Sequence, residues 1–253
     1  MIALSVLAAY CDDLLQVKQF KDYCPNGLQI EAGAEVRRIV GGVTASKAIV
    51  DQAVKKKADV LLVHHGYFWR GEPEPIVGIK GARITSLIKH DVSLLAYHLP
   101  LDAHPLYGNN AQLASLLGLQ VSGAFGGRSG EVSVGLYGSL ELPQTAEMFA
   151  ARLESVLGRK PLHIKGHDRP LSRIAWCSGA AQNYFEQAIH LGVDAFFTGE
   201  VSEQSYHLAK EYGVDFFSAG HHATERYGVK ALGAHLAEQF DLHFEFVDLD
   251  NPV

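Results

Sequence analysis

The sequence predicts an α/β fold: two related three-layer α/β lobes that arise from an internal duplication, with a metal site between them. Three observations lead to this class. Apolar strands alternate with helical stretches, one part of the chain resembles another part further along, and His and carboxylate residues follow the ends of strands. The composition agrees, because 47% hydrophobic and 20% charged residues over 253 positions are typical of one or two globular domains.

The predicted elements of the first lobe follow one another closely. An apolar strand is expected over residues 38–43, a helix from about Ser46 to Lys57, and a second strand over residues 59–63. This strand–helix–strand spacing is typical of a βαβ unit with parallel strands. A further helix is expected to include residues 85–89, and residues 93–97 form the third predicted strand.

The second lobe repeats this pattern. Residues 172–201 align without a gap on residues 37–66, at a constant offset of 135 positions. Residues 215–219 then match the third strand loosely. The sequence therefore predicts an internal duplication. Its six identities are Arg38 with Arg173, Ile39 with Ile174, Ala45 with Ala180, Gln52 with Gln187, Ala53 with Ala188, and Asp59 with Asp194.

The lobes are expected to span residues 1–125 and 126–253. A segment over about residues 126–170 has no counterpart in the repeat, and it is expected to connect the lobes or cap the second one. Within it, a short strand is expected around residues 132–137 and a helix around residues 145–157.

Charge and cysteine content exclude several functional classes. The net charge of −6 disfavours broad capture of nucleic acid or of an anionic membrane. Three scattered cysteines indicate neither a disulfide framework nor a thiolate zinc site. The apolar N-terminal stretch has no basic region and is interpreted as an amphipathic helix, and no apolar run reaches the length of a membrane span. A cytoplasmic location is therefore expected.

Polar clusters follow three of the predicted strands. They are His64 with His65, the segment from His98 to Asp102, and the segment from His221 to Glu225. In open α/β sheets, ligands gather beyond the carboxyl ends of the strands. Imidazole and carboxylate ligands together suit zinc, iron or manganese. The candidate metal ligands are His64, His65, Asp102, His221 and Glu225.

The spacing of these residues along the chain limits which of them could bind the same ion. Adjacent side chains diverge along a strand, so His64 and His65 would serve two neighbouring ions if the chain turns after them, which Gly66 permits. His221 and Glu225 lie on one helical face if a helix begins after Gly220.

A carboxylate between two cations would offset their repulsion, and either Asp102 or Glu225 could bridge them. Pro100 is expected to keep His98 and Asp102 off one regular helical face.

The pattern leaves more than one role open for His98 and for Glu200. His98 could be a ligand, a donor to a ligand, or a group that moves protons, and it is the candidate catalytic residue. Glu200 stands at the repeat position of His65, so it could face the same cleft or have a structural role. For the remaining histidines of these regions, capping or surface roles are preferred: His104, His163, His167 and His222.

Four motifs resemble the Nif-three-like dinuclear-metal family, whose bacterial members are labelled homologues of type 2 GTP cyclohydrolase I. The motifs are residues 23–30 (YCPNGLQI), 63–69 (VHHGYFW), 98–102 (HLPLD) and 220–225 (GHHATE). The resemblance implies a two-lobed fold, a toroidal homohexamer and two divalent metal ions per subunit. It further implies that His64 and Asp102 bind one ion, that His65 and His221 bind the other, and that Glu225 bridges them.

These ligands predict a metal-dependent hydrolase, and the resemblance implies GTP or another nucleotide as its substrate. In the GTP version, metal-activated water attacks the purine C8, the ring opens and formate is released, while His98 or Glu200 moves protons. A phosphoester hydrolase is an alternative, with phosphate bound by Arg70, Lys80 and Arg83. A non-catalytic metal-binding regulator, carrier or adaptor would use the same ligands.

Overall fold

The computed structural model describes residues 1–127 and 130–253, and the chain forms two compact units. The first comprises Met1–Tyr107 and Gly228–Asp250, and the second comprises Gly108–Tyr227 and Asn251–Val253. These boundaries differ from the expected division at residue 125. The chain enters the second unit earlier because α5 (Asn109–Leu117) and β7 (Leu119–Phe125) pack with that unit's sheet. It then returns to the first unit within α9 (His221–Phe240).

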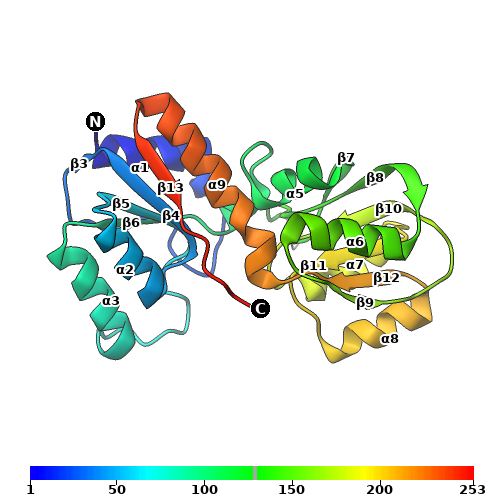
Figure 1. Ribbon diagram of the computed structural model, residues 1–253. Coiled ribbons are helices and arrows are strands. Elements are labelled where there is room, and N and C mark those ends of the chain that lie inside the picture. Colours follow the sequence, from blue (N-terminus) through cyan, green and yellow to red (C-terminus); the bar gives the residue numbers. More distant parts are fainter. Residues whose placement is uncertain (128–129) are drawn as a thin grey trace. The chain divides into compact units, whose positions relative to one another are not determined.

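A five-stranded sheet forms the centre of the first unit (Figure 1), with the order β13-β4-β5-β6-β2. Strands β13, β4, β5 and β6 run parallel, and β2 is antiparallel to β6. A separate antiparallel pair joins β1 to β3. The elements are β1 (Ile2–Ala3), α1 (Leu4–Leu14), η1 (Val17–Gln19), β2 (Gly27–Ile30), β3 (Glu35–Val36), β4 (Arg38–Thr44), α2 (Lys47–Lys55), β5 (Val60–His65), α3 (Gly78–Lys89), β6 (Ser93–Ala96), α4 (Leu99–Ala103) and β13 (His243–Phe246).

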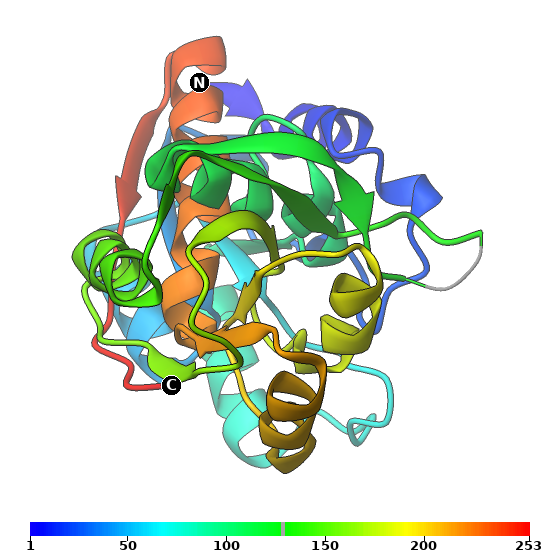
Figure 2. The ribbon, with the colours of Figure 1, turned by 90° about the vertical axis from the view of Figure 1, so that its right-hand side faces the viewer.

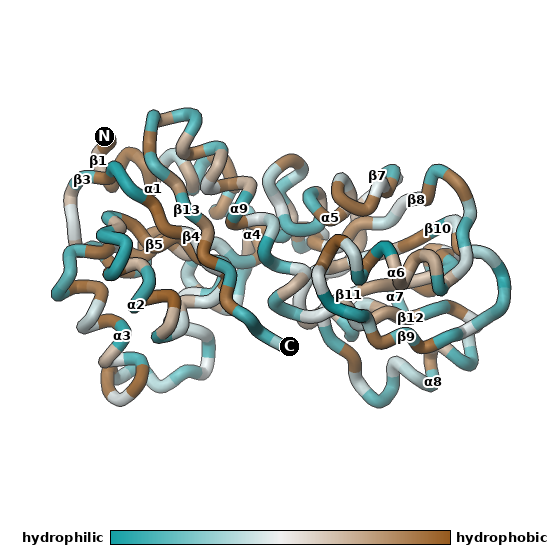
Figure 3. The backbone as a smooth tube through the Cα atoms, in the orientation of Figure 1, coloured by the Kyte–Doolittle hydropathy of each residue, from teal (hydrophilic) through white to brown (hydrophobic). Residues whose placement is uncertain are grey.

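Helices cover both faces of this sheet. Leu62 and Leu95 pack with side chains of α1 and α9 on one face, whereas Leu61 and Leu94 pack with side chains of α2 and α3 on the other. Because successive side chains of a strand point to opposite faces, a strand buried on both faces must be apolar throughout. Figure 3 shows this apolar character along β4. The first unit is therefore a three-layer α/β lobe.

The second unit contains a six-stranded sheet of order β7-β8-β10-β11-β12-β9 (Figure 2). The three strands β10, β11 and β12 are parallel, and β7, β8 and β9 pair antiparallel with their neighbours. The further elements are β8 (Gly135–Gln144), α6 (Ala146–Leu157), β9 (Leu162–Ile164), β10 (Leu171–Trp176), η2 (Gln182–Tyr184), α7 (Phe185–His190), β11 (Ala195–Thr198), α8 (Glu203–Tyr212) and β12 (Asp215–Ser218).

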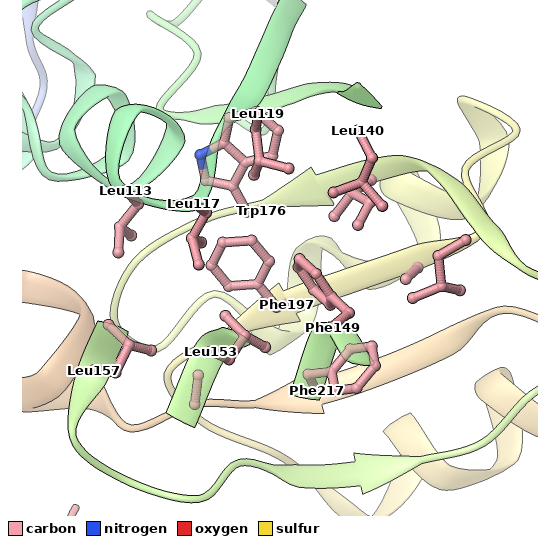
Figure 4. Close-up of a cluster of buried hydrophobic side chains, with 14 of the residues drawn as sticks. Leu113, Leu117, Leu119, Leu140, Phe149, Leu153, Leu157, Trp176, Phe197 and Phe217 are labelled. Atoms are coloured by element: carbon pink, nitrogen blue, oxygen red, sulfur yellow. The ribbon is translucent and has the colours of Figure 1, made fainter. Parts of the chain in front are cut away.

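Aromatic side chains fill the core of the second unit. Phe197 and Phe217 belong to the buried cluster that α5 and α6 cover, where Phe149 contacts both (Figure 4). On the other face, Phe185 of α7 contacts Phe196. This unit is thus a second α/β lobe with buried side chains on both faces of its sheet.

The two units share one topology. The order β4-β5-β6-β2 of the first sheet corresponds to β10-β11-β12-β9 of the second, with three parallel strands followed by one antiparallel strand in each case. Strands β9 and β2 begin at Leu162 and Gly27, which the same offset of 135 relates. Residues 126–170 therefore do not simply connect or cap, because β9 completes the repeated sheet and β8 pairs with β10.

Most of the expected elements lie within a few residues of their predicted positions, and the exceptions have local causes. Strand β5 continues through His64 and His65 rather than ending before them, because Thr44 of β4 pairs with His65. Residues 85–89 lie in helix α3, as predicted, and this helix begins at Gly78. No helix in the described part of the chain is long and apolar enough to cross a membrane.

Candidate metal centre

His64 and His65 are the last two residues of β5, at the carboxyl end of three parallel strands. Their ring centroids lie 4.7 Å apart, although neighbouring strand residues point to opposite faces. His64 is fully buried and His65 is half-buried. The strand predicted over residues 59–63 extends two residues further, and the two rings lie close together although both residues belong to it.

Each of these two rings is held through Nδ1. His64 Nδ1 donates to the backbone oxygen of Tyr97 at 2.8 Å, and His65 Nδ1 is 3.0 Å from the hydroxyl of Thr44. A partner at Nδ1 fixes both the ring orientation and the nitrogen that can coordinate an ion. Nε2 is therefore the nitrogen of each ring that could coordinate an ion.

His98 joins this pair from the neighbouring strand end. Its ring centroid lies 5.1 Å from that of His64 and 5.7 Å from that of His65. One nitrogen from each of the three rings lies within 4.8 Å of the other two. The Nδ1 of His98 donates to Asp22 at 2.7 Å, so this ring is also held through Nδ1.

Asp102 brings a carboxylate to the same end of the first unit's sheet. It lies in α4, and its Oδ2 is 3.5 Å from His64 Nε2. His98 precedes α4 as its N-cap with non-helical backbone angles, and its carbonyl accepts a hydrogen bond from the Asp102 N–H at 3.1 Å. Pro100 occupies the first turn of α4, where a missing N–H costs no hydrogen bond.

The second unit has a histidine–carboxylate pair of its own, His221 and Glu225, near the start of α9, which begins directly after Gly220 as the spacing predicts. His221 Nε2 is 3.1 Å from Glu225 Oε2, and its Nδ1 is 2.7 Å from Glu200 Oε1. Burial by itself would lower the pKa of His221, but the hydrogen bonds to Glu225 and Glu200 outweigh burial and raise the pKa to about 9. These contacts place Glu200 behind the ring of His221.

Two glycines make room for this pair. Gly179 adopts φ +66°, and a Cβ at this position would collide with the Glu225 carboxylate. A Cβ on Gly199 would lie 2.6 Å from the Cα of His221. The two carboxyl-end loops of the second sheet are thus shaped around the first turn of α9.

The donor sets fit a divalent transition metal. The first unit offers three imidazoles and one carboxylate, and the second offers one imidazole and one carboxylate. In each unit a carboxylate oxygen stands close to an imidazole Nε2, an arrangement that a cation between them would stabilise. Nitrogen and oxygen ligands of this kind suit zinc, iron or manganese.

Sequence reasoning missed the residues that orient these rings. Thr44 ends β4, and Asp22 directly precedes the 23–30 motif, but neither position carries a ligand signal of its own. Other histidines make different contacts: the ring of His104 accepts from the N–H groups of Leu106 and Tyr107, and His163 stacks on Phe217.

Comparison with known proteins identifies the family. The model of the family Duf34/NIF3 (NGG1p interacting factor 3) matches residues 2–252. The chain belongs to the Duf34/NIF3 family.

Curated Duf34/NIF3 relatives include a "GTP cyclohydrolase 1 type 2 homolog" of Pseudomonas aeruginosa, which is 53% identical over 99% of both chains. The protein of the same name from Vibrio cholerae is 52% identical over 98% of both chains.

Solved structures match over the full length of the chain. The protein ybgI superposes with a TM-score of 0.95 at 45% identity, and a protein from Thermus thermophilus superposes with a TM-score of 0.89 at 34% identity, each covering 100% of both chains. HcgD of Methanocaldococcus jannaschii, at 21% identity and a TM-score of 0.84, shares the fold. The two-lobed α/β architecture is therefore that of the family.

Proposed function

We propose that this Duf34/NIF3 protein is a metal-dependent hydrolase that binds two divalent ions per subunit. In this proposal His64 and Asp102 bind one ion, His65 and His221 bind the other, and Glu225 bridges both. The observation that carries it is the common orientation of the histidine rings, each held through Nδ1 so that Nε2 is the coordinating atom. The proposal requires that ligands from both units share the two ions.

Metal analysis tests the ligand assignment. We expect about two ions per chain in the wild-type protein after loading with zinc, iron or manganese, and fewer in His64→Ala and Glu225→Ala. His207→Ala is the matched control, because His207 is an exposed residue of α8 that pairs with Glu203 of the same helix. Unchanged metal content in both ligand variants would refute the assignment.

The reaction that we propose is opening of a purine ring in GTP or a related nucleotide. Bound divalent ions would activate water and polarise the substrate. The chain's own contribution is the arrangement of His98 beside His64 and His65, where its Nε2 can accept and return a proton. The names of the curated relatives support a GTP cyclohydrolase-like reaction.

Incubation of the metal-loaded protein with GTP, followed by formate detection, tests this reaction. We expect formate release that is lost in His64→Ala and strongly reduced in His98→Ala. Full metal occupancy without formate release would reject the cyclohydrolase assignment and would favour a metal-binding regulator or carrier.

A phosphoester hydrolase is the second candidate. Arg70 donates to the backbone oxygen of Asp22, and its guanidinium lies 6.0 Å from the ring centroid of Tyr23, so this cation borders the segment that holds His98. Lys80 instead lies 3.7 Å from Glu72 and contacts Phe68. A panel of nucleotides and simple phosphoesters separates the two reactions, because only the phosphoester activity releases phosphate or alcohol without formate.

We further propose that the protein assembles as a toroidal homohexamer in the cytoplasm. Exposed apolar side chains near the start of α3 support an assembly surface: Ile76, Val77 and Ile79 are 54%, 68% and 71% exposed. Light scattering on the purified protein should give about six times the 27.6 kDa chain mass. A monomer at micromolar concentration would contradict the proposal.

A further inference from the structure

The Asp22 carboxylate makes four hydrogen bonds. Oδ1 accepts from His98 Nδ1 at 2.7 Å and from the Tyr23 N–H at 2.6 Å. Oδ2 accepts from Asn26 Nδ2 at 2.8 Å and from the Leu99 N–H at 3.0 Å. The side chain is 3% exposed. A carboxylate with this many donors is ionised and strongly held.

Asp22 and Asn26 hold His98 at two points and its neighbour Leu99 at a third. Asp22 holds the ring, Asn26 Oδ1 accepts the backbone N–H of His98 at 2.7 Å, and Asp22 also accepts the N–H of Leu99. His98 and Asp22 are 76 positions apart in the sequence, so the contact depends on the fold and not on a local turn. The ring therefore has little freedom to rotate.

Hydrogen bonding to a carboxylate also determines where the ring proton lies. The ionised carboxylate can only accept, so His98 Nδ1 must carry the hydrogen, and Nε2 of the neutral ring then bears the lone pair. Burial by itself would raise the pKa of Asp22, but hydrogen bonds from His98, from Asn26 and from the Tyr23 N–H outweigh burial, and the pKa is lowered. The carboxylate thus remains ionised at neutral pH.

We propose that Asp22 is the positioning residue for His98. It holds the Nδ1–H tautomer and directs the Nε2 lone pair toward the donor atoms of His64 and His65. The part that His98 plays in turnover rests on the proposed function, but the tautomer and the orientation do not. Asp22 thereby acts on the reaction through His98 and without a contact to the substrate.

Nitrogen-15 NMR of the histidine rings in metal-free protein tests the tautomer. We expect the His98 ring to give the signature of a protonated Nδ1 and an unprotonated Nε2 in the wild type. Asp22→Ala should lose that signature, because neutral imidazole otherwise favours a mixture dominated by the other tautomer. A wild-type ring that carries its hydrogen on Nε2 would overturn the proposal even if the variant does not fold.

Asn26→Ala separates positioning from general support of the loop. It removes the bond to the His98 backbone and one bond to Asp22, but it leaves the carboxylate–ring contact in place. We expect the wild-type tautomer in Asn26→Ala together with a lower thermal midpoint. Loss of the tautomer in Asn26→Ala to the same extent as in Asp22→Ala would mean that loop integrity, and not Asp22, sets the ring state.

Metal-loaded protein distinguishes failure of this inference from failure of the proposed function. Asp22→Ala should keep the wild-type metal content. Its kcat should fall about 10- to 100-fold, which is the usual cost of removing the partner of a functional imidazole. Absence of bound ions from the wild type would reject the metal centre and leave the NMR result valid. Loss of an ion from His98→Ala would make His98 a ligand and overturn its assignment as the proton-moving group.

Discussion

Asp59 and Asp194 make the same hydrogen bonds in the two units. Asp59 Oδ2 accepts from the backbone N–H groups of residues 37–38, both at 2.8 Å, and Asp194 Oδ2 accepts from those of residues 172–173, both at 2.9 Å. Each aspartate directly precedes the second strand of its repeat and ties it to the start of the first. The duplication therefore preserves individual hydrogen bonds as well as topology.

This correspondence predicts equal effects from equivalent substitutions. Asp59→Ala and Asp194→Ala each leave two backbone N–H groups without their carboxylate acceptor, so each should lower the free energy of unfolding by about 1–3 kcal/mol. Asp51→Ala is the control, because Asp51 forms an exposed ion pair with Lys47, and its loss should cost less than about 0.5 kcal/mol. Urea unfolding measures all three. If only one of the two aspartate variants lost stability, the equivalent hydrogen bonds would not contribute equally to the free energy of unfolding.

The sequence predicted the parallel strands well and the antiparallel strands poorly. Strands β4, β5 and β6 are buried on both faces, so their apolar runs stand out from the helices between them. In contrast, β9 has three residues, of which only Ile164 is buried, and most residues between the ends of β7 are exposed. Such short or exposed strands are determined by their neighbours in the sheet and leave little pattern in the sequence.

The residues of the candidate site also fall into two groups, those that the sequence indicates and those that only the structure shows. His64, His65 and Glu225 could be proposed as metal ligands from the sequence, because residue type and position after strand ends both favour that role. Asp22 and Thr44 could not, since each acts through a hydrogen bond to a ring that lies far along the chain. Residues that orient such rings become visible only when the fold brings the two segments together.

Glu200 is expected to orient His221. Its Oε1 lies 2.7 Å from His221 Nδ1, so Glu200→Ala removes the contact that holds the ring. We expect metal affinity to fall about 10- to 100-fold, because that is the usual cost of losing a partner behind a ligating imidazole. Glu203→Ala is a close match, since Glu203 also pairs with a histidine but on the exposed surface of α8. Competition with a coloured chelator measures both variants, and equal affinities would contradict the role of Glu200.

Gly179 is expected to be intolerant of any side chain. Gly179→Ala imposes a strained positive φ and places a methyl group against the Glu225 carboxylate. Gly158→Ala is the control, because Gly158 has φ +71° and no atom near its potential Cβ. We expect about 1 kcal/mol of destabilisation in the control, from backbone strain alone.

Gly179→Ala should be destabilised further and should also bind less metal. Thermal unfolding and metal analysis report the two effects, and wild-type metal content in Gly179→Ala would show that Glu225 can shift without losing an ion.

Asp215 is expected to make the second unit sensitive to acid. Burial by itself would raise its pKa, but His163, whose Nε2 lies 3.4 Å from Oδ2, and the hydrogen bond from the Gly166 N–H outweigh burial, and the pKa is lowered. A group whose folded pKa lies below its unfolded value stabilises the protein above the unfolded pKa, which is about 3.9 for aspartate, and this stabilisation is lost as the pH falls through the folded value.

Asp215→Asn keeps the shape of the side chain and removes the charge. It should therefore be less stable than the wild type at pH 7 by about 1–3 kcal/mol, and the difference should shrink as the pH falls below about 4. Denaturant unfolding at pH 7, 5 and 3 measures the difference. A gap that stays constant with pH would show that the ionised carboxylate is not what stabilises this end of β12.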